Sequence, residues 1–282
     1  MSAETRTSES TAAPERSFAP AMCSIFSVTA DRSLATGPDT THPWGARVSN
    51  VRSPRWNQLV FEMMAPRYLR PLNILDLGCA GGGWVRDCID WGHDAVGIDG
   101  SDWGKVHGNG EWRTIPDRLF TADITERFEV LHYGALFTCD LITSFEVMEH
   151  IEESGISGVC ANIHRHLRRD GLFICSVNPY ADNHNGMEYH ATVKPLPWWE
   201  EKFKNNGLYR LRQHEHYFAG HFLRGPKHPI SGGPSLVLSP HPDLAPPVPS
   251  KGALRWALDH WLGSLPQRCL QYAVCGPTNE NR

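Results

Sequence analysis

Five consecutive residues, Glu146-Val147-Met148-Glu149-His150, place two carboxylates and an imidazole within a short stretch of chain. On a helix, side chains at positions i, i+3 and i+4 share one face, so Glu146, Glu149 and His150 would converge. Carboxylates this close repel each other unless a cation lies between them. Oxygen ligands suit magnesium, and a mixed oxygen and nitrogen set suits zinc or manganese. Without a metal, His150 could act as a general base or as a structural hydrogen-bond partner.

The elements that position this stretch are buried strands followed by loops. An apolar segment over residues 139–145 precedes it directly and predicts a strand. Earlier, residues 74–77 predict another strand, which leads into a glycine-rich turn, a helix over 84–91 and a strand over 95–98 that ends at an aspartate. This order is typical of a doubly wound parallel sheet that binds a nucleoside-type cofactor at the carboxyl ends of its strands.

Asp76 helps to distinguish between two kinds of cofactor. Gly78, Ala80 and Gly83 match the dinucleotide fingerprint loosely, and Asp99 could hold a ribose, so a nicotinamide cofactor stays open. However, Asp76 stands two residues before the first glycine, where we expect its carboxylate to face the mouth of the turn and to repel a pyrophosphate. S-adenosylmethionine has no phosphates and carries an ammonium and a sulfonium, so the acid favours that cofactor.

The sequence LDLGCAGG at residues 75–82 resembles the first motif of the class I S-adenosylmethionine-dependent methyltransferases, with Ala80 in place of the usual middle glycine. The resemblance covers about residues 70–220. It implies an α/β fold with a doubly wound, mostly parallel seven-stranded sheet and an antiparallel last strand. It also implies a set of cofactor-binding residues: Asp76, Gly78, Cys79, Ala80, Gly82, Asp99, Gly100, Asp123, Ile124 and Phe145.

Two members of this implied set have more specific roles. By the resemblance, Asp123 would accept a hydrogen bond from the adenine amino group, and Ile124 would lie against the adenine ring. The alternative for Asp123 is a helix N-cap.

The E-x-x-E-H stretch, followed later by a histidine, resembles two metal-using families, the ubiquinone-biosynthesis O-methyltransferases and the small-RNA 2′-O-methyltransferases. His190 stands where that later histidine would fall. The resemblance implies a divalent metal (Mg, Mn or Zn) held by Glu146, Glu149, His150 and His190, with Glu146, His150 and His190 as the catalytic candidates. Metal-free methyltransferases also have similar stretches, so the alternative without a metal stays open.

These features together predict a methyltransferase that acts on a hydroxyl oxygen of a small molecule. The formal net charge of -4 and the pI near 6.4 provide no basic field for nucleic acid. A local basic strip, Arg165, Arg168 and Arg169, keeps an RNA 2′-O-methyltransferase as an alternative. An N- or C-methyltransferase without metal and a non-catalytic S-adenosylmethionine-binding protein are the others.

Composition also indicates a compartment. The eight cysteines include no C-x-x-C pair, which favours a reducing compartment and no zinc knuckle. No apolar run reaches the roughly eighteen residues of a membrane span, and the first residues lack the apolar core of a signal peptide. We therefore expect a cytoplasmic protein.

The expected organisation is a flexible tail over residues 1–45, a methyltransferase domain over 46–239 and a proline-rich extension over 240–282. Residues 146–166 predict a helix broken near Gly155, and residues 208–223 predict a strand that carries His214 and His216. The connection over 100–116 is long and contains two tryptophans, so we expect it to fold onto the domain.

Overall fold

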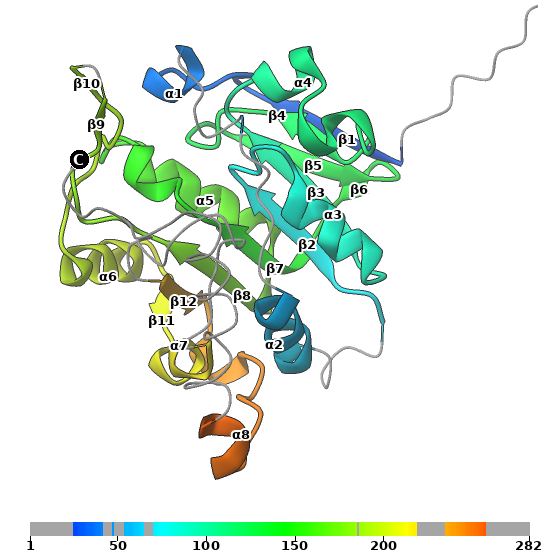
Figure 1. Cartoon of the computed structure of the whole chain (residues 1–282), viewed down its shortest axis with the longest axis vertical. Helices are drawn as coiled ribbons and strands as arrows, with labels where there is room; N and C mark the ends of the chain where they lie inside the picture. The colour runs from blue at the N-terminus through cyan, green and yellow to red at the C-terminus, as the bar shows by residue number, and fades with distance from the viewer. Residues whose placement is uncertain are drawn as a thin grey trace, which may run out of the picture.

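A seven-stranded sheet forms the centre of the structure, a computed structural model (Figure 1). The structure describes residues 25–41, 47, 54–64, 70–184, 186–218 and 235–257. The strand order is β11-β12-β8-β7-β2-β3-β4. These strands are β2 (Asn73–Leu77), β3 (Asp94–Asp99), β4 (Leu119–Thr121), β7 (Cys139–Ser144), β8 (Leu167–Ser176), β11 (Tyr209–Arg210) and β12 (Ser235–Ser239).

Five neighbouring strands of this sheet run parallel, from β4 through β3, β2 and β7 to β8. The strand β12 pairs antiparallel with β8, and the short β11 pairs antiparallel with β12. The central strands are apolar almost throughout because helices cover both faces of the sheet. The prediction of a doubly wound, mostly parallel sheet of seven strands is therefore confirmed.

Two sets of helices cover the sheet. On one face lie α2 (Pro54–Met64), α3 (Gly83–Asp90) and α7 (Arg212–Phe218), whose buried side chains share one apolar core. On the other face lie α5 (Ile156–His166) and α6 (Leu196–Asn205), which contribute to a second core. In α2, Trp56 is fully buried and packs edge-on against Trp84 of α3, with ring centroids 5.0 Å apart.

A second, three-stranded antiparallel sheet includes residues 26–30, which belong to the segment 1–45 predicted as a flexible tail; residues 1–24 and 42–45 lie outside the described part. The sheet consists of β1 (Phe26–Ala30), β5 (Phe128–His132) and β6 (Ala135–Leu136), in the order β1-β5-β6. Phe26 is 1% exposed and contacts Phe137 edge-on at 5.1 Å between centroids. The partner of β1 lies about a hundred residues further along the chain, so no local pattern could reveal the pairing.

Two further predictions of secondary structure are wrong. Residues 146–166 do not form one broken helix: a 3-10 turn, η4, spans Met148–His150, and α5 begins only at Ile156. Residues 208–223 do not form one strand, because β11 ends at Arg210 and α7 follows; residues 219–223 lie outside the described part. The buried residues Leu211, His214, Tyr217 and Phe218 have helical spacing, which agrees with a helix and not with a strand.

The remaining elements are short. They are α1 (Pro38–Thr41), α4 (Trp103–His107), η3 (Gly110–Arg113), β9 (Asn183–His184), β10 (Met187–Glu188), η5 (Pro242–Leu244) and α8 (Ala253–Ala257). Within the described residues, none of the helices has the length and apolar character that crossing a bilayer requires.

Candidate active site

The turn between β2 and α3 uses left-handed backbone at three positions. Gly78, Ala80 and Gly82 have φ angles of 76°, 47° and 78°. The amides of Gly78 and Cys79 both donate to the carbonyl of Ile98 on β3, at 2.7 and 3.0 Å. A Cβ atom on Gly78 would lie 2.1 Å from Val147 Cγ2, so only glycine allows this close approach. The turn is thereby held against the carboxyl end of β3.

Asp99 fixes this turn from the end of β3. Its Oδ2 accepts a hydrogen bond from the Ala80 amide at 2.7 Å, and its Oδ1 accepts one from the Ser101 amide at 2.9 Å. The residue predicted to hold a ribose therefore also organises the loop beside which a ribose would lie. Its charge, together with that of Asp76 and above all with burial, raises the pKa of the Cys79 thiol well above its usual value.

Asp76 lies elsewhere than expected. We predicted a carboxylate at the mouth of the turn, but the side chain is 1% exposed and its Oδ1 accepts from the Thr143 hydroxyl on β7 at 2.6 Å. The Trp84 indole donates to the same hydroxyl oxygen at 3.0 Å. Because alternate residues of a strand point to opposite faces, Asp76 lies on the face that α2 and α3 cover.

The connection between β3 and β4 folds back over the glycine turn, as predicted. The Trp112 indole donates to the carbonyl of Ala80 at 2.8 Å, and the Glu111 amide donates to the carbonyl of Gly81 at 2.7 Å. Gly110 permits this contact, since a Cβ atom there would lie 2.5 Å from the Gly81 oxygen. The long connection therefore forms one wall of the turn.

Asp123 follows β4 and is 3% exposed. Its Oδ1 accepts from both the amide and the hydroxyl of Thr125, at 2.9 and 2.7 Å, which closes a side-chain turn. Its Oδ2 pairs with Arg32 at 3.0 Å. The alternative of a helix N-cap is wrong, because the chain continues into β5 rather than into a helix.

Three other predicted cofactor residues lie near these loops. The carbonyl of Gly100 accepts from the Ala35 amide at 2.9 Å. Ile124 is buried in the core beside β5. Phe145, at the end of β7, is 4% exposed and packs edge-on against Trp56 at 5.4 Å between centroids.

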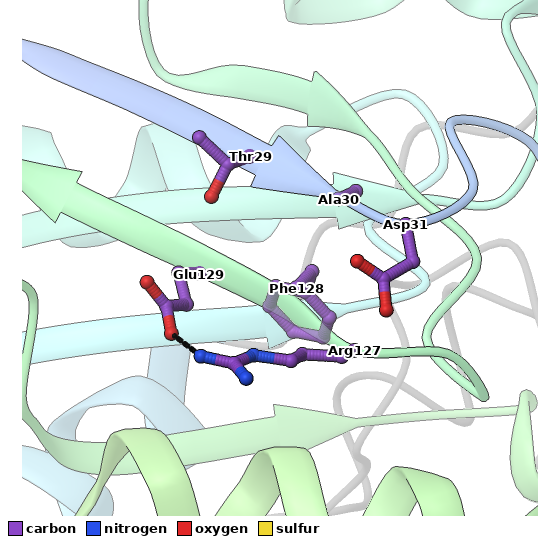
Figure 2. Close-up of a pocket in the computed structure, with 6 residues that line it drawn as sticks. All are labelled: Thr29, Ala30, Asp31, Arg127, Phe128 and Glu129. Atoms are coloured by element: carbon purple, nitrogen blue, oxygen red, sulfur yellow. Dashed lines mark hydrogen bonds and ion pairs between the residues drawn. The ribbon is translucent and has the colours of Figure 1, made fainter.

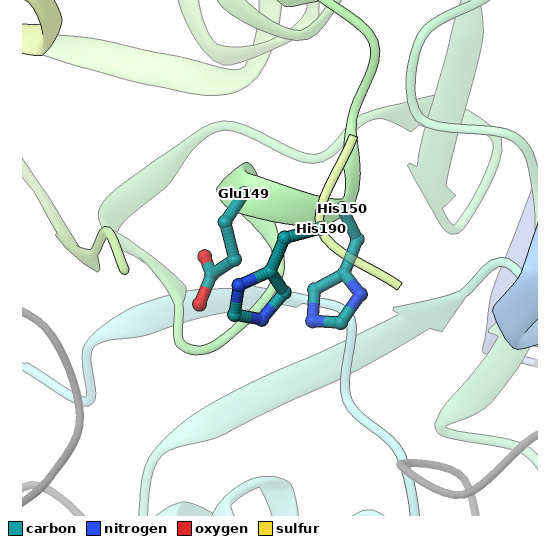
Figure 3. A group of neighbouring side chains, drawn as sticks. All are labelled: Glu149, His150 and His190. Atoms are coloured by element: carbon teal, nitrogen blue, oxygen red, sulfur yellow. The ribbon is translucent and has the colours of Figure 1, made fainter. Parts of the chain in front are cut away.

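Three of the four predicted metal ligands come together (Figure 3). Each of Glu149, His150 and His190 offers a ligand atom, and these atoms lie within 4.8 Å of one another. The two imidazole rings are perpendicular, with centroids 4.8 Å apart. Figure 3 shows the carboxylate and both rings pointing the same way from two different segments of the chain. The turn η4 after β7 supplies two of the side chains, and the segment after β10 supplies the third.

The tautomer of His190 follows from its neighbour. Its Nδ1 lies 2.5 Å from the carbonyl oxygen of Tyr180. A carbonyl only accepts, so Nδ1 carries the proton and Nε2 keeps its lone pair in the neutral ring. Metal-binding histidines commonly use one nitrogen for the metal and donate from the other to a backbone carbonyl. His190 is therefore in the tautomer that a histidine needs to bind a metal through Nε2.

Glu146 lies outside this group of three. It adopts a left-handed conformation with φ of 57°, so it does not share a helix face with Glu149 and His150 as predicted. Its amide donates to the Ser176 hydroxyl oxygen at 2.8 Å, and that hydroxyl donates to Glu146 Oε1 at 3.0 Å. The contact with Ser176 holds Glu146 Oε1.

The donor set fits a metal in type, but its atoms lie further apart than the ligands of a bound ion. Ligand bonds to zinc or magnesium are about 2.1 Å, so ligand atoms lie about 3.4 Å apart around a tetrahedral ion and about 3.0 Å apart at neighbouring positions of an octahedral one. The separations here, up to 4.8 Å, exceed these distances by over an ångström. Side-chain rotation could close this difference, since the three residues come from a turn and a loop.

Arg32 and Thr143 were not among the predicted site residues, and Tyr180, a possible acceptor contact by sequence, contributes through its backbone carbonyl instead. Arg32 belongs to a segment of low complexity, and Thr143 is one of several polar residues in an apolar strand. A carbonyl oxygen leaves no signal in the amino-acid type. The threonine was the detectable one, because a polar residue inside an apolar strand requires a partner.

The fold and the glycine turn define a Rossmann-like methyltransferase architecture, and a family comparison agrees. A family model described as a methyltransferase domain matches residues 51–225. The chain belongs to this family, within the class I S-adenosylmethionine-dependent methyltransferases.

Individual relatives are distant. The ubiquinone biosynthesis O-methyltransferase of Sinorhizobium fredii is 26% identical over 139 residues, which are 47% of this chain and 52% of the relative. The chain thus matches about half the length of this curated relative.

Two solved methyltransferase structures are similar to this chain at low sequence identity. A 1,6-didemethyltoxoflavin-N1-methyltransferase from Burkholderia thailandensis has a TM-score of 0.45 at 17% identity, covering 70% of this chain and 78% of that one. A TehB-like methyltransferase from Corynebacterium glutamicum has a TM-score of 0.41 at 22% identity, covering 65% and 92%.

Proposed function

We propose that this chain transfers a methyl group from S-adenosylmethionine to a hydroxyl oxygen of a small molecule, assisted by a divalent metal. The observation that carries the proposal is the convergence of Glu149, His150 and His190 beyond the carboxyl end of β7. In an open α/β sheet this edge is where ligands bind. The cofactor would lie beside it, against the turn at Gly78–Gly82 and the end of β3.

Each side chain has a defined task in this proposal. Methyl transfer from a sulfonium needs an acceptor that is aligned with the methyl group and that loses its proton. Glu149 supplies a negative charge, and His190 presents the lone pair of Nε2 beside His150. A bound divalent metal would lower the pKa of the acceptor hydroxyl. Without the metal, the half-buried His150 is the group placed to take the acceptor proton.

Two observations favour a small hydroxyl acceptor over RNA. The curated relative is described as a ubiquinone biosynthesis O-methyltransferase, a name that points to a small molecule and not to RNA. In addition, the basic strip lies at the opposite end of the parallel strands, where β8 begins, and two of its three arginines form ion pairs. Arg165 contacts Glu129 at 3.4 Å, and Arg168 contacts Asp140 at 3.4 Å. These arginines therefore do not form a cationic groove beside the histidines, as binding an RNA backbone there would require.

The experiment that tests the proposal is calorimetric titration with S-adenosylmethionine before and after chelation, with metal analysis of the same sample. We expect binding, one divalent ion per chain, and loss of that ion in His190→Ala and Glu149→Gln. The matched control is His164→Gln, because His164 is an exposed histidine on α5 that contacts the carbonyl of Asn206. The control variant should keep the metal.

The other outcomes separate the alternatives. Cofactor binding without any metal would make His150 the base and reopen nitrogen and carbon acceptors. Cofactor binding without turnover of any acceptor would favour a non-catalytic binding protein. No binding of S-adenosylmethionine would contradict the proposal. The domain limits at residues 46 and 239 and the cytoplasmic location remain predictions.

A further inference from the structure

A segment upstream of the family match lies across the proposed cofactor site. We propose that residues 31–36, called the strap from here on, cover the nucleoside half of that site, and that Arg32 is a positioning residue that orients Asp123 toward the adenine amino group. The inference rests on the proposed function. It goes beyond it because the family match begins at residue 51 and does not include the strap.

The strap is anchored at its start by the small sheet. β1 pairs with β5 along five residues, from Phe26 opposite His132 to Ala30 opposite Phe128. The amide of Asp31 then donates to the carbonyl of Arg127 at 2.9 Å. Figure 2 shows Asp31 where the chain leaves β1, beside the start of β5. The strap therefore begins from a fixed point on the domain.

From there the strap touches the carboxyl ends of two neighbouring strands. The Asp123 amide, just past β4, donates to the carbonyl of Arg32 at 3.0 Å. The Ala35 amide donates to the carbonyl of Gly100, just past β3, at 2.9 Å. These are the two places where we expect the adenine and the ribose. The strap thus spans the nucleoside half of the site.

The approach of the strap to Gly100 is close enough to require glycine. A Cβ atom on Gly100 would lie 2.9 Å from the Cβ atom of Ala35. Two methyl-sized groups cannot approach to that distance, so the absent side chain of Gly100 makes room for the strap. The glycine directly after Asp99 is therefore needed for the contact with the strap, and not only for the approach of a ligand.

Counting acceptor sites on Asp123 shows what Arg32 does. An ionised carboxylate has about four lone-pair sites, two on each oxygen. Thr125 uses two of them on Oδ1, and Arg32 uses one on Oδ2. The remaining site on Oδ2 fits one N–H donor, such as the exocyclic amino group of adenine. Arg32 and Thr125 together hold the carboxylate in one orientation for that donor.

Arg32 gives the buried Asp123 carboxylate a partner of opposite charge. The Asp123 side chain is 4% exposed, whereas that of Arg32 is 47% exposed and also contacts Glu126 at 3.2 Å. A buried carboxylate requires a partner with opposite charge. Arg32 provides this partner from the solvent side, so its removal should affect the orientation of Asp123 more than the core of the domain.

The test compares two ligands and four proteins. S-adenosylhomocysteine carries an amino group on its purine, whereas S-inosylhomocysteine carries a carbonyl oxygen there, which a carboxylate repels. Calorimetry would measure both affinities for the wild type, Arg32→Ala, Arg32→Lys and Arg127→Ala. Arg127 is the matched control because it lies on the small hollow of about 180 Å³ between β1 and β5 and pairs with Glu129 at 2.6 Å (Figure 2).

We expect the wild type and Arg127→Ala to prefer the adenosyl ligand equally. Arg32→Ala should bind S-adenosylhomocysteine about tenfold more weakly, the order of one charged hydrogen bond, and should lose most of the preference for it over S-inosylhomocysteine. Arg32→Lys should keep part of that preference. Equal preference in Arg32→Ala and Arg127→Ala would overturn the inference. No binding of either ligand to the wild type would instead overturn the proposed function.

Hydrogen exchange provides a second readout on the unmodified protein. If the strap covers the nucleoside, S-adenosylhomocysteine should slow the exchange of the Ala35 amide, which is bonded to the carbonyl of Gly100. Unchanged exchange in the peptide that covers residues 31–36, with ligand saturating, would contradict a covering role.

Discussion

At the scale of single residues, two glycines of one loop differ in what an alanine would do. At one position it would only strain the backbone, and at the other it would also collide with a neighbour. Gly108 and Gly110 both have positive φ, 57° and 56°. A Cβ atom on Gly108 would meet nothing within 4 Å, whereas one on Gly110 would lie 2.5 Å from the carbonyl oxygen of Gly81. Alanine at either position incurs the left-handed penalty of about 1–2 kcal/mol, but only at Gly110 does it also push the glycine turn.

We therefore expect Gly110→Ala to weaken S-adenosylmethionine binding by about tenfold or more, as a displaced binding loop would, and to lower the free energy of unfolding more than Gly108→Ala. Calorimetry and urea denaturation measure the two effects. Equal cofactor affinities in the two variants would show that the contact with Gly81 does not shape the site.

Residue types and spacing predicted part of the candidate metal site. The E-x-x-E-H pattern and the later histidine identified Glu149, His150 and His190, which the fold does bring together. The same pattern misplaced Glu146, because helical spacing was assumed where the backbone turns left-handed. A single residue in that conformation is a tertiary outcome, set here by the contact with Ser176, and no local propensity predicts it.

At the scale of elements, the β9–β10 hairpin determines the position of His190. One oxygen of Glu188, Oε1, accepts from the amide of Asp182 at 2.9 Å and from that of His190 at 3.3 Å. The Tyr189 amide donates to the carbonyl of Asp182 at 2.8 Å. The base of the hairpin is therefore closed by the carboxylate of Glu188, two residues before the candidate ligand His190.

Glu188→Ala should lower the metal affinity by about tenfold, the lower end of the effects of outer-shell partners. Glu188→Gln should retain most of the affinity, because its carbonyl oxygen can accept the same two bonds. Metal titration with a competing chelator measures both, with the exposed Glu201→Ala on α6 as the control. If the alanine and glutamine variants behave alike, the hairpin contact does not position His190.

The strand β1 allows a direct test of whether the N-terminal segment belongs to the fold. Phe26 is 1% exposed, stacks on His132 at 4.4 Å and lies 4.6 Å below the guanidinium of Arg118. Phe26→Ala should lower the free energy of unfolding by about 3–5 kcal/mol. Its neighbour Ile25 is 36% exposed, so Ile25→Ala should cost under about 1 kcal/mol. Similar losses in both variants would contradict a structural role for β1.

Elements with local signals were predictable, and those with distant partners were not. The buried strands and α3 follow from apolar runs and glycine turns that lie within about ten residues. β1 was missed because it pairs with β5 across the whole first half of the domain. The helix α7 was misassigned because its few apolar residues also fit a strand when only part of the segment is considered.

At the scale of the whole molecule, buried histidines should make stability depend on pH. Burial lowers the pKa of His93, His166 and His214 from the usual 6.5. His166 shows why the neutral ring is favoured: its Nε2 accepts from the Val130 amide at 3.1 Å, and its Nδ1 contacts the carbonyl of Asn162 at 2.9 Å. Below pH 6.5 the unfolded chain therefore binds more protons than the folded one.

The free energy of unfolding should accordingly be constant with respect to these groups above about pH 7.5 and fall as the pH decreases below 6.5. The slope is at most about 1.4 kcal/mol per pH unit for each histidine that stays neutral. Urea denaturation at several pH values between 5 and 8 measures it, and His166→Gln should reduce the slope. A free energy that rises on acidification through this range would contradict the assignment.

For the molecule as a whole, the sequence predicted the fold class. Alternating strands and helices imply a parallel sheet with both faces covered, and the sheet has that form. The strap could not be predicted, because the contact between Arg32 and Asp123 joins residues 91 positions apart in a segment without periodicity. Its role depends on tertiary proximity alone.

The buried thiols have a consequence for handling and for measurement. Cys79, Cys88, Cys139, Cys160 and Cys175 are all buried and free, and burial raises the pKa of each. Alkylating reagents attack thiolates, so these positions can react only when the surrounding structure opens. Site-resolved alkylation rates would then report local opening at the glycine turn through Cys79 and at α5 through Cys160. The native sequence thus carries its own set of chemical probes of local unfolding.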